Sequence, residues 1–122
     1  MKLHVSSASG ANTITAYGDD YVAVNGARRD SNVIVTATEV RDWSAADFAH
    51  LSAEHFAELA RLGVEIVLLG TGARQRFPHP RLTAPLSAAH VGLEVMDTKA
   101  ACRTYNILVA EERRVALALL LE

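Results

Sequence analysis

This sequence has one cysteine, no long apolar run and little net charge. The single cysteine, Cys102, has no partner for an internal disulfide and excludes a cysteine-based zinc site, which is typical of a reducing compartment. The longest apolar run near the end, Val115–Leu121, is far shorter than the roughly 20 residues that span a bilayer. The beginning, MKLHVSSASG, lacks the apolar core of a signal peptide. We therefore expect a cytoplasmic protein without membrane insertion.

The charges nearly cancel. Twelve lysines and arginines against 14 aspartates and glutamates give a formal net charge of −2, which excludes a broad basic face for nucleic acid. Half of the residues are hydrophobic and 21% are charged. A chain of 122 residues with this composition fits one domain, residues 1–122, that buries about two thirds of its unfolded surface. We expect a single α/β domain with no nucleic-acid partner.

Histidine and cysteine do not form a recognisable catalytic or metal-ligating pattern. His50 and His55 are five residues apart, whereas paired ligands on one helix need a spacing of four. His79 and His90 have no carboxylate or cysteine at ligand spacing. Cys102 falls in the first turns of a predicted helix, where a thiol pKa can fall, but its apolar surroundings favour a buried core residue. We expect no metal and no cofactor.

The first third of the chain favours short strands. Asn12–Tyr17 and Tyr21–Val24 are β-prone runs, and Gly18-Asp19-Asp20 between them predicts a hairpin turn. Asn25-Gly26 is a second turn signal. The charged triplet Arg28-Arg29-Asp30 after it favours a solvated loop, with a binding patch as the alternative. The polar segment before this hairpin, at the start of the chain, is predicted to be a frayed end or an edge segment.

A third strand and a helix follow. The strand is Val33–Ala37, and the only tryptophan, Trp43, comes soon after it in a charged segment. We interpret this tryptophan as a plug at one end of the core, with an exposed partner anchor as the alternative. Ala53–Leu62 has apolar residues at helical spacing between Ser52, a potential cap, and Gly63, a potential helix terminator.

The second half of the chain predicts a parallel strand pair. Val64–Leu69 is almost continuously apolar, as in a strand that is covered on both faces. Pro80–His90 is a short helical or irregular crossover broken at Pro85, and Val91–Met96 is the next strand. A strand, a crossover and a strand place the two strands parallel and their carboxyl ends at one edge of the sheet.

A helix and a last strand complete the predicted domain. The helix Lys99–Glu112 is capped by Asp97 or Thr98, and its apolar stripe packs on the sheet. Val115–Leu121 is predicted to be a final strand, although alanine and leucine also favour helix. The predicted fold is a three-layer single domain with a mixed central sheet, a βαβ unit, flanking helices and an N-terminal β-hairpin.

Two polar junctions should meet at the carboxyl edge of this sheet and border a crevice, where open α/β sheets usually bind ligands. Gly70–Gln75 leaves one strand and Asp97–Thr98 leaves the other. The Gly-Thr-Gly of the first junction is either a phosphate-binding loop or a tight turn. The tight turn is favoured, because the third glycine, the lysine and the helix of the standard nucleotide-binding loops are all missing.

Charged side chains suggest two further hypotheses. Arg74, Arg76 and Arg103 are candidates to converge on the crevice and to hold a small anion or an acidic partner. Glu65 and Glu94 lie early in neighbouring strands and suggest a carboxylate pair. The favoured alternative is that such glutamates pair with arginines, Arg61 among them.

The segments EIVLLGTG, EVMDTKAACRTYNIL and EERRVALALL resemble a family of small single-domain α/β proteins, largely uncharacterised and prokaryotic. The family is related to mitochondrial respiratory complex I assembly factor 3 and to an adipogenesis-associated cytosolic protein. Its pattern falls on these residues: Gly70, Thr71, Gly72, Met96, Thr98, Ala101, Thr104, Tyr105, Asn106 and Leu108. The resemblance implies a three-layer fold and no established enzymatic activity. The basic, serine-rich extension of a mitochondrial precursor is not present, so we do not carry over the organelle role.

Two functions remain from the sequence. The first is a non-catalytic binding or assembly protein that uses the rim of the crevice at Gly70-Thr71-Gly72 to hold another polypeptide, with a respiratory-complex subunit as a candidate partner. The second is a small-molecule binder or enzyme acting on an anionic ligand in the same crevice. The candidate binding residues for both are Gly70, Thr71, Gly72, Arg74, Gln75, Thr98, Arg103, Thr104 and Asn106.

Overall fold

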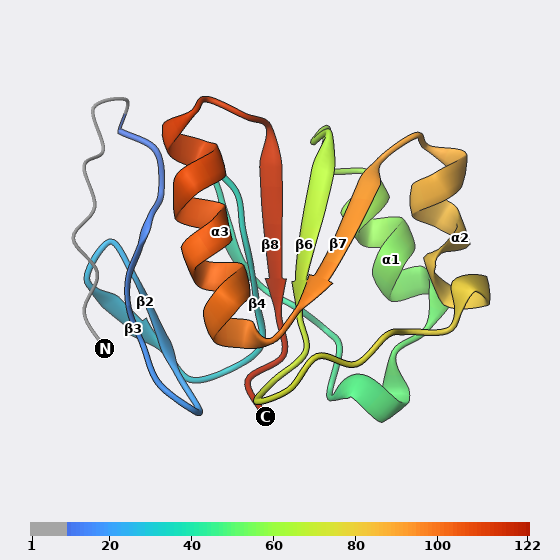
Figure 1. Ribbon diagram of the computed structural model, residues 1–122, viewed down its shortest axis with the longest axis horizontal. Coiled ribbons are helices and arrows are strands. Elements are labelled where there is room, and N and C mark those ends of the chain that lie inside the picture. Colours follow the sequence, from blue (N-terminus) through green and yellow to red (C-terminus); the bar gives the residue numbers. More distant parts are fainter. Residues whose placement is uncertain (1–9) are drawn as a thin grey trace.

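Two β-sheets and three α-helices make up the computed structural model, which describes residues 10–122 (Figure 1). The prediction for the polar start of the chain therefore lies almost wholly outside the described residues. The strands are β1 (Ile14–Tyr17), β2 (Val22–Val24), β3 (Ala27–Arg29), β4 (Val33–Val35), β5 (Val40–Asp42), β6 (Ile66–Gly70), β7 (Gly92–Met96) and β8 (Val115–Leu119). The helices are the 3-10 turn η1 (Phe48–His50), α1 (Ala53–Ala60), α2 (Pro80–Ala88) and α3 (Thr98–Ala110).

The larger sheet has five strands in the order β5-β4-β8-β6-β7. Strand β6 is parallel to both of its neighbours, with Ile66 opposite Gly92 of β7 and opposite Val115 of β8. The parallel pairing of β6 and β7 is confirmed, and so is the final strand β8. Strands β4 and β8 are antiparallel, as are β4 and β5, so the sheet is mixed.

Alternating side chains fill a separate core on each face of this sheet. In β6, Leu68 belongs to one hydrophobic cluster, whereas Val67 and Leu69 belong to the other. Strand β8 divides in the same way, with Leu117 on one side and Ala118 on the other. Because successive side chains of a strand point to opposite faces, a nearly continuous apolar run is needed to cover both.

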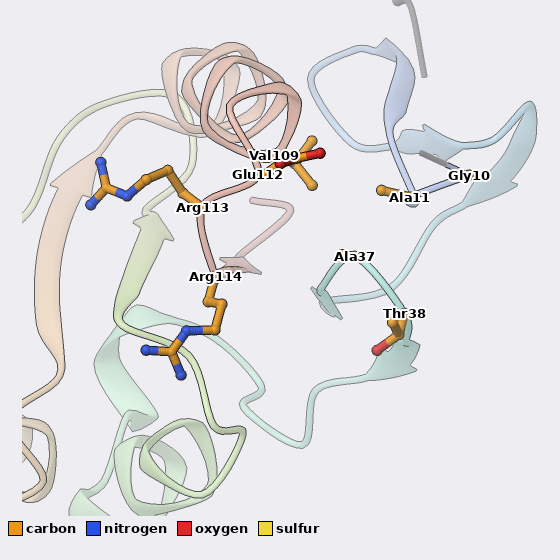
Figure 2. A pocket seen from close by; sticks show the side chains of 8 residues that line it. All are labelled: Gly10, Ala11, Ala37, Thr38, Val109, Glu112, Arg113 and Arg114. Atoms are coloured by element: carbon orange, nitrogen blue, oxygen red, sulfur yellow. The ribbon is translucent and has the colours of Figure 1, made fainter. Parts of the chain in front are cut away.

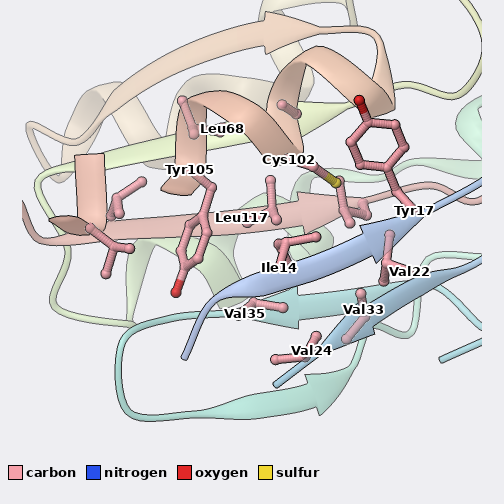
Figure 3. Close-up of a cluster of buried hydrophobic side chains, with 14 residues drawn as sticks. Ile14, Tyr17, Val22, Val24, Val33, Val35, Leu68, Cys102, Tyr105 and Leu117 are labelled. Atoms are coloured by element: carbon pink, nitrogen blue, oxygen red, sulfur yellow. The ribbon is translucent and has the colours of Figure 1, made fainter. Parts of the chain in front are cut away.

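The two clusters define three layers. Helices α1 and α2 cover one face of the five-stranded sheet, with Phe56, Leu59 and Leu86 fully or almost fully buried against it. Helix α3 and the small sheet β1-β2-β3 cover the other face, and Figure 3 shows their side chains around Cys102 and Tyr105. The predicted three-layer α/β fold with its N-terminal hairpin is confirmed.

Each α-helix begins at a side chain that binds its first turn. Ser52 and His55 form a capping box at α1, the ring of His79 accepts the Arg81 N–H at α2, and Asp97 accepts the Ala100 N–H at 2.9 Å at α3. Of the two predicted caps of α3, Asp97 is the one observed. Helix α2 continues through its internal proline, so the predicted break in that crossover is wrong.

Two charged segments form strands that the sequence did not predict. The first is β3, which follows Asn25 (φ 52°) and Gly26 (φ 84°), whose positive φ angles close a two-residue hairpin turn from β2. The second is β5, which pairs with β4 through Val40 and Asp42. Arg28-Arg29-Asp30 is therefore not simply a solvated loop. Both strands lie at sheet edges, where charged side chains remain in water.

Trp43 lies in the core, with 4% of its surface exposed, so the core interpretation is confirmed and an exposed partner anchor at this position is wrong. Among the helices of residues 10–122, none combines the length and the apolar character needed to cross a bilayer.

Candidate functional site

The two junctions at the carboxyl ends of β6 and β7 are bonded directly to each other. The Thr71 N–H donates to the Met96 carbonyl at 2.9 Å, which continues the ladder between the strands. One residue later, the Gly72 N–H donates to Thr98 Oγ1, and the Thr98 N–H donates to the Gly72 carbonyl, both at 2.9 Å. The predicted meeting of the two junctions at one edge is thus observed, and they are in contact rather than separated by a cleft.

At both glycines of Gly-Thr-Gly, neighbouring atoms lie too close for a side chain. A Cβ on Gly70 would lie 2.6 Å from Leu119 Cδ2 and 3.1 Å from Thr98 Cα. A Cβ on Gly72, which has a φ of 92°, would lie 2.7 Å from the Glu122 carbonyl oxygen. These glycines let the start of α3 and the end of the chain reach β6.

The amides that a phosphate-binding loop would expose are already occupied. The N–H groups of Thr71 and Gly72 both donate inside the protein, and Asp97 caps the first turn of α3 with its carboxylate. The Thr71 side chain is also used, because its hydroxyl contacts the Arg74 carbonyl at 2.7 Å and accepts the Arg76 N–H. The tight turn is therefore the correct interpretation of Gly-Thr-Gly.

A pocket of about 340 Å³ adjoins this turn. It is lined by Gly18, Asp19, Gly72, Ala73, Asp97, Thr98, Lys99 and Glu122. Three of these residues carry carboxylates and one an ammonium group, and Lys99 Nζ lies 2.9 Å from Asp19. The hydrogen bond to Asp19 raises the pKa of Lys99. The net charge of the lining is negative, so it attracts cationic groups and repels anions.

None of the three candidate arginines lines this pocket, so they do not converge on it. Arg74 is exposed and its side chain has no partner among the described residues. Arg76 forms an ion pair with Glu122, donates to the Thr71 carbonyl and lies over the ring of Phe48.

The other candidate donors bind within the protein. Arg103 donates to the Tyr17 hydroxyl at 2.9 Å, and Gln75 donates to the carbonyl of Val95 at 2.8 Å. The Thr104 hydroxyl contacts Met96 Sδ at 3.4 Å. Asn106 exchanges two bonds of 2.9 Å with the backbone N–H and carbonyl of Ile14, which joins α3 to β1. Of these donors, Gln75 and Arg103 are exposed and can still meet a partner.

Two hypotheses for catalysis do not match the geometry. Cys102 is fully buried, and burial raises its thiol pKa to about 12, so it is a core residue as the sequence favoured. Glu65 is bound to Arg113 at 2.7 Å, and that hydrogen bond lowers the pKa of its carboxyl. The expected arginine partnership is therefore real, but Arg61 pairs with Glu54 instead.

A second pocket, of about 320 Å³, lies at the other end of α3 (Figure 2). Its wall includes Gly10, where the described chain begins, together with Val109, Arg113 and Arg114. The two guanidinium groups point away from Gly10 in Figure 2. They bind Glu65 and the Gly63 carbonyl respectively. This pocket therefore lacks the convergent polar groups of a ligand-binding site. The sheet edge at residues 70–76 is the better candidate for a functional site.

Sequence reasoning missed three charged residues of the first pocket. The sequence places Asp19 only in the hairpin turn and Lys99 only in the helix that follows Asp97 and Thr98. Glu122 reaches the pocket because Leu119 pairs with Gly70, a register that one sequence does not reveal. The sequence offered one signal, at Asp19. A turn that joins two strands lies at an end of their sheet, so its charged residue can border a site there.

Comparison with known proteins agrees with this architecture. A solved Bordetella parapertussis protein is 44% identical, with a TM-score of 0.87 over 93% of this chain and 98% of its own. A Bordetella pertussis protein, described as a Mth938-like domain, is 39% identical, with a TM-score of 0.79 over 98% of this chain and 92% of its own.

Several curated relatives carry the same functional name. NADH dehydrogenase [ubiquinone] 1 alpha subcomplex assembly factor 3 of Danio rerio is 30% identical over 93% of this chain. This chain spans 66% of that protein's length. The sequence model of the family described as "Protein of unknown function (DUF498/DUF598)" matches residues 14–120. The chain therefore belongs to the DUF498/DUF598 family.

Proposed function

We propose that this protein is a non-catalytic binding protein that holds another polypeptide during the assembly of a respiratory complex. The observation that carries this proposal is the similarity to the Danio rerio assembly factor, which extends over 93% of this chain. A match over this share of the chain includes β6, β7, the junctions that follow them and α3. An assembly role resting on this domain would therefore use a surface that the two proteins share.

The surface that we propose is the sheet edge formed by residues 70–76 and 97–106. In this proposal the buried residues Gly70, Thr71, Gly72 and Thr98 shape the edge. The exposed side chains contact the partner, Arg74 above all, because its guanidinium group has no hydrogen bond or ion pair among the described residues. Guanidinium groups suit carboxylates of a polypeptide through charge-assisted bonds.

The negative lining of the first pocket weighs against the alternative of an anionic small molecule. Asp19, Asp97 and Glu122 would repel such a ligand, and Lys99 is already paired. The occupied amides of Thr71 and Gly72 offer it no cradle. A polypeptide that binds outside the pocket avoids this repulsion.

Site-specific photocrosslinking in the native cell tests the proposal. A photoreactive amino acid replaces Arg74, and in a matched control it replaces Thr38, which is exposed at the opposite end of the fold. We expect the Arg74 position, and not the Thr38 position, to crosslink to a subunit of respiratory NADH dehydrogenase. Equal products at the two positions, or a copurified small molecule without any protein, would contradict the proposal.

A further inference from the structure

Phe77 is the most exposed large hydrophobic side chain of the described chain. Solvent reaches 71% of its surface, compared with 59% for Ile107 on α3. Aromatic side chains supply much of the energy at protein interfaces when a partner covers them. Phe77 lies in the segment between β6 and α2, directly after the proposed binding edge.

The backbone around Phe77 is held on both sides. Before it, the Arg76 N–H donates to Thr71 Oγ1 at 3.0 Å, and the Arg76 guanidinium donates to the Thr71 carbonyl at 2.7 Å. After it, the ring of His79 caps the start of α2. A side chain presented by an anchored loop loses little conformational freedom on binding, which favours affinity.

Two arginines without side-chain partners in the described structure flank Phe77 in the sequence. Arg74 and Arg81 are within four residues of Phe77, are both exposed, and have no side-chain hydrogen bond or ion pair within residues 10–122. Every other arginine of that range contacts a carboxylate, a backbone carbonyl or a phenol hydroxyl. The two arginines whose side chains have no partner in this range therefore lie within four positions of the most exposed large hydrophobic residue.

We propose that Phe77, Arg74 and Arg81 form a docking surface for an acidic segment of another polypeptide that also carries an apolar side chain. The apolar side chain covers Phe77, while carboxylates pair with the two guanidinium groups. This inference rests on the proposed function and names the chemistry of its partner.

The surrounding charges favour a polypeptide over a phosphate-rich surface. The pocket with three carboxylates begins at Gly72 and Ala73, immediately before Arg74. A nucleic acid or an anionic bilayer would bring dense negative charge against these groups. An extended peptide places its carboxylates at separate positions and can avoid them.

A random peptide library displayed on phage and selected against the full chain supplies the probe. We expect the selected peptides to be rich in aspartate and glutamate and to contain an aromatic or aliphatic residue. Synthetic versions then report affinity by fluorescence polarisation. Phe77→Ala should weaken binding by at least about tenfold. The double variant Arg74→Glu with Arg81→Glu should weaken it at least as much and remove most of its salt dependence.

The matched controls are Ile107→Ala, which removes the other exposed apolar side chain, and Arg28→Glu, which reverses an exposed arginine on β3. Both should bind like the unaltered protein. Selected peptides without acidic residues, or full affinity in Phe77→Ala, would overturn the docking surface. Tighter binding to phosphatidylglycerol vesicles than to the peptides would also overturn it. So would a dimer, seen by analytical ultracentrifugation, that Phe77→Ala dissolves.

Copurification separates this inference from the proposed function. If a respiratory subunit copurifies equally with the unaltered protein and with Phe77→Ala, the assembly role stands and the docking surface is wrong. If acidic peptides bind through Phe77 while the photocrosslinking at Arg74 yields no respiratory subunit, the docking surface stands and the assembly role is wrong.

Discussion

Gly72 and Thr98 bind each other through two hydrogen bonds of 2.9 Å, one from each backbone N–H. The Thr98 hydroxyl accepts the first of these bonds and itself donates to the Leu120 carbonyl at 3.0 Å. One side chain, 5% exposed, therefore connects the turn after β6, the start of α3 and the segment after β8.

Thr98→Val keeps the size of the side chain but removes its hydroxyl. The Gly72 N–H and the Leu120 carbonyl then lose a partner in a buried place, so we expect the free energy of unfolding to fall by about 2 to 4 kcal/mol. Urea denaturation measures the loss. The control is Thr38→Val, at an exposed position. A loss at Thr98 no larger than at Thr38 would show that water replaces these bonds.

Gly72→Ala should destabilise the protein more than Gly26→Ala. Both glycines have positive φ angles, 92° and 84°, but only Gly72 has neighbours within 4 Å of the added Cβ. The left-handed strain, roughly 1–2 kcal/mol, is common to both variants. We expect the clash with Glu122 to add about 1 to 3 kcal/mol at Gly72. Equal values in chemical denaturation would mean that the chain end moves aside easily.

The central part of the fold was predictable because it depends on local patterns. A strand buried on both faces needs an unbroken apolar run, and β6 and β8 have one. The edge strands β3 and β5 do not, because their charged residues, Arg28 and Arg41 among them, remain in contact with water. Their pairing depends on neighbours elsewhere in the chain, which periodicity alone does not reveal.

The candidate site was predictable in place but not in the use of its side chains. Topology brings the ends of β6 and β7 to one edge, and this was correct. The sequence also identifies Asn106 as a hydrogen-bonding residue, yet its partner, Ile14, lies 92 positions earlier. Phe77 was overlooked, although an aromatic residue between arginines in a polar segment was a usable signal.

The thiol of Cys102 should be inert in the folded protein. Burial raises its pKa to about 12, so at pH 8 only about one molecule in 10,000 carries a thiolate. We expect no reaction with Ellman's reagent within minutes at pH 8, and full reaction after denaturation in guanidinium chloride. Rapid labelling of the native protein would show that the helix α3 opens locally.

The same pKa shift predicts weaker stability in alkali. An unfolded cysteine loses its proton near pH 8.5, whereas the folded thiol keeps it up to about pH 12. The unfolded state therefore binds fewer protons in that window, and stability falls as the pH rises through it. Tyr105, whose pKa is also raised by burial, acts in the same direction. Cys102→Ala should lose less stability between pH 8 and pH 10 than the unaltered protein loses.

Substitutions at Asn106 and Arg74 should separate residues that hold the fold from residues that face a partner. Asn106→Leu breaks both bonds to Ile14 and leaves two backbone groups of β1 without partners, so we expect a loss of about 2 to 3 kcal/mol in unfolding free energy. Arg74→Glu should stay within about 0.5 kcal/mol of the unaltered protein, because its exposed side chain forms no hydrogen bond or ion pair within the described residues.

Arg103→Glu should fall between these two, because it breaks one bond, to the Tyr17 hydroxyl. Thermal unfolding followed by circular dichroism gives the order of the three variants. A large loss in Arg74→Glu would mean that this arginine supports the loop before α2. Its reduced partner binding could then no longer be attributed to the surface, and the photocrosslinking result would have to decide between the two roles.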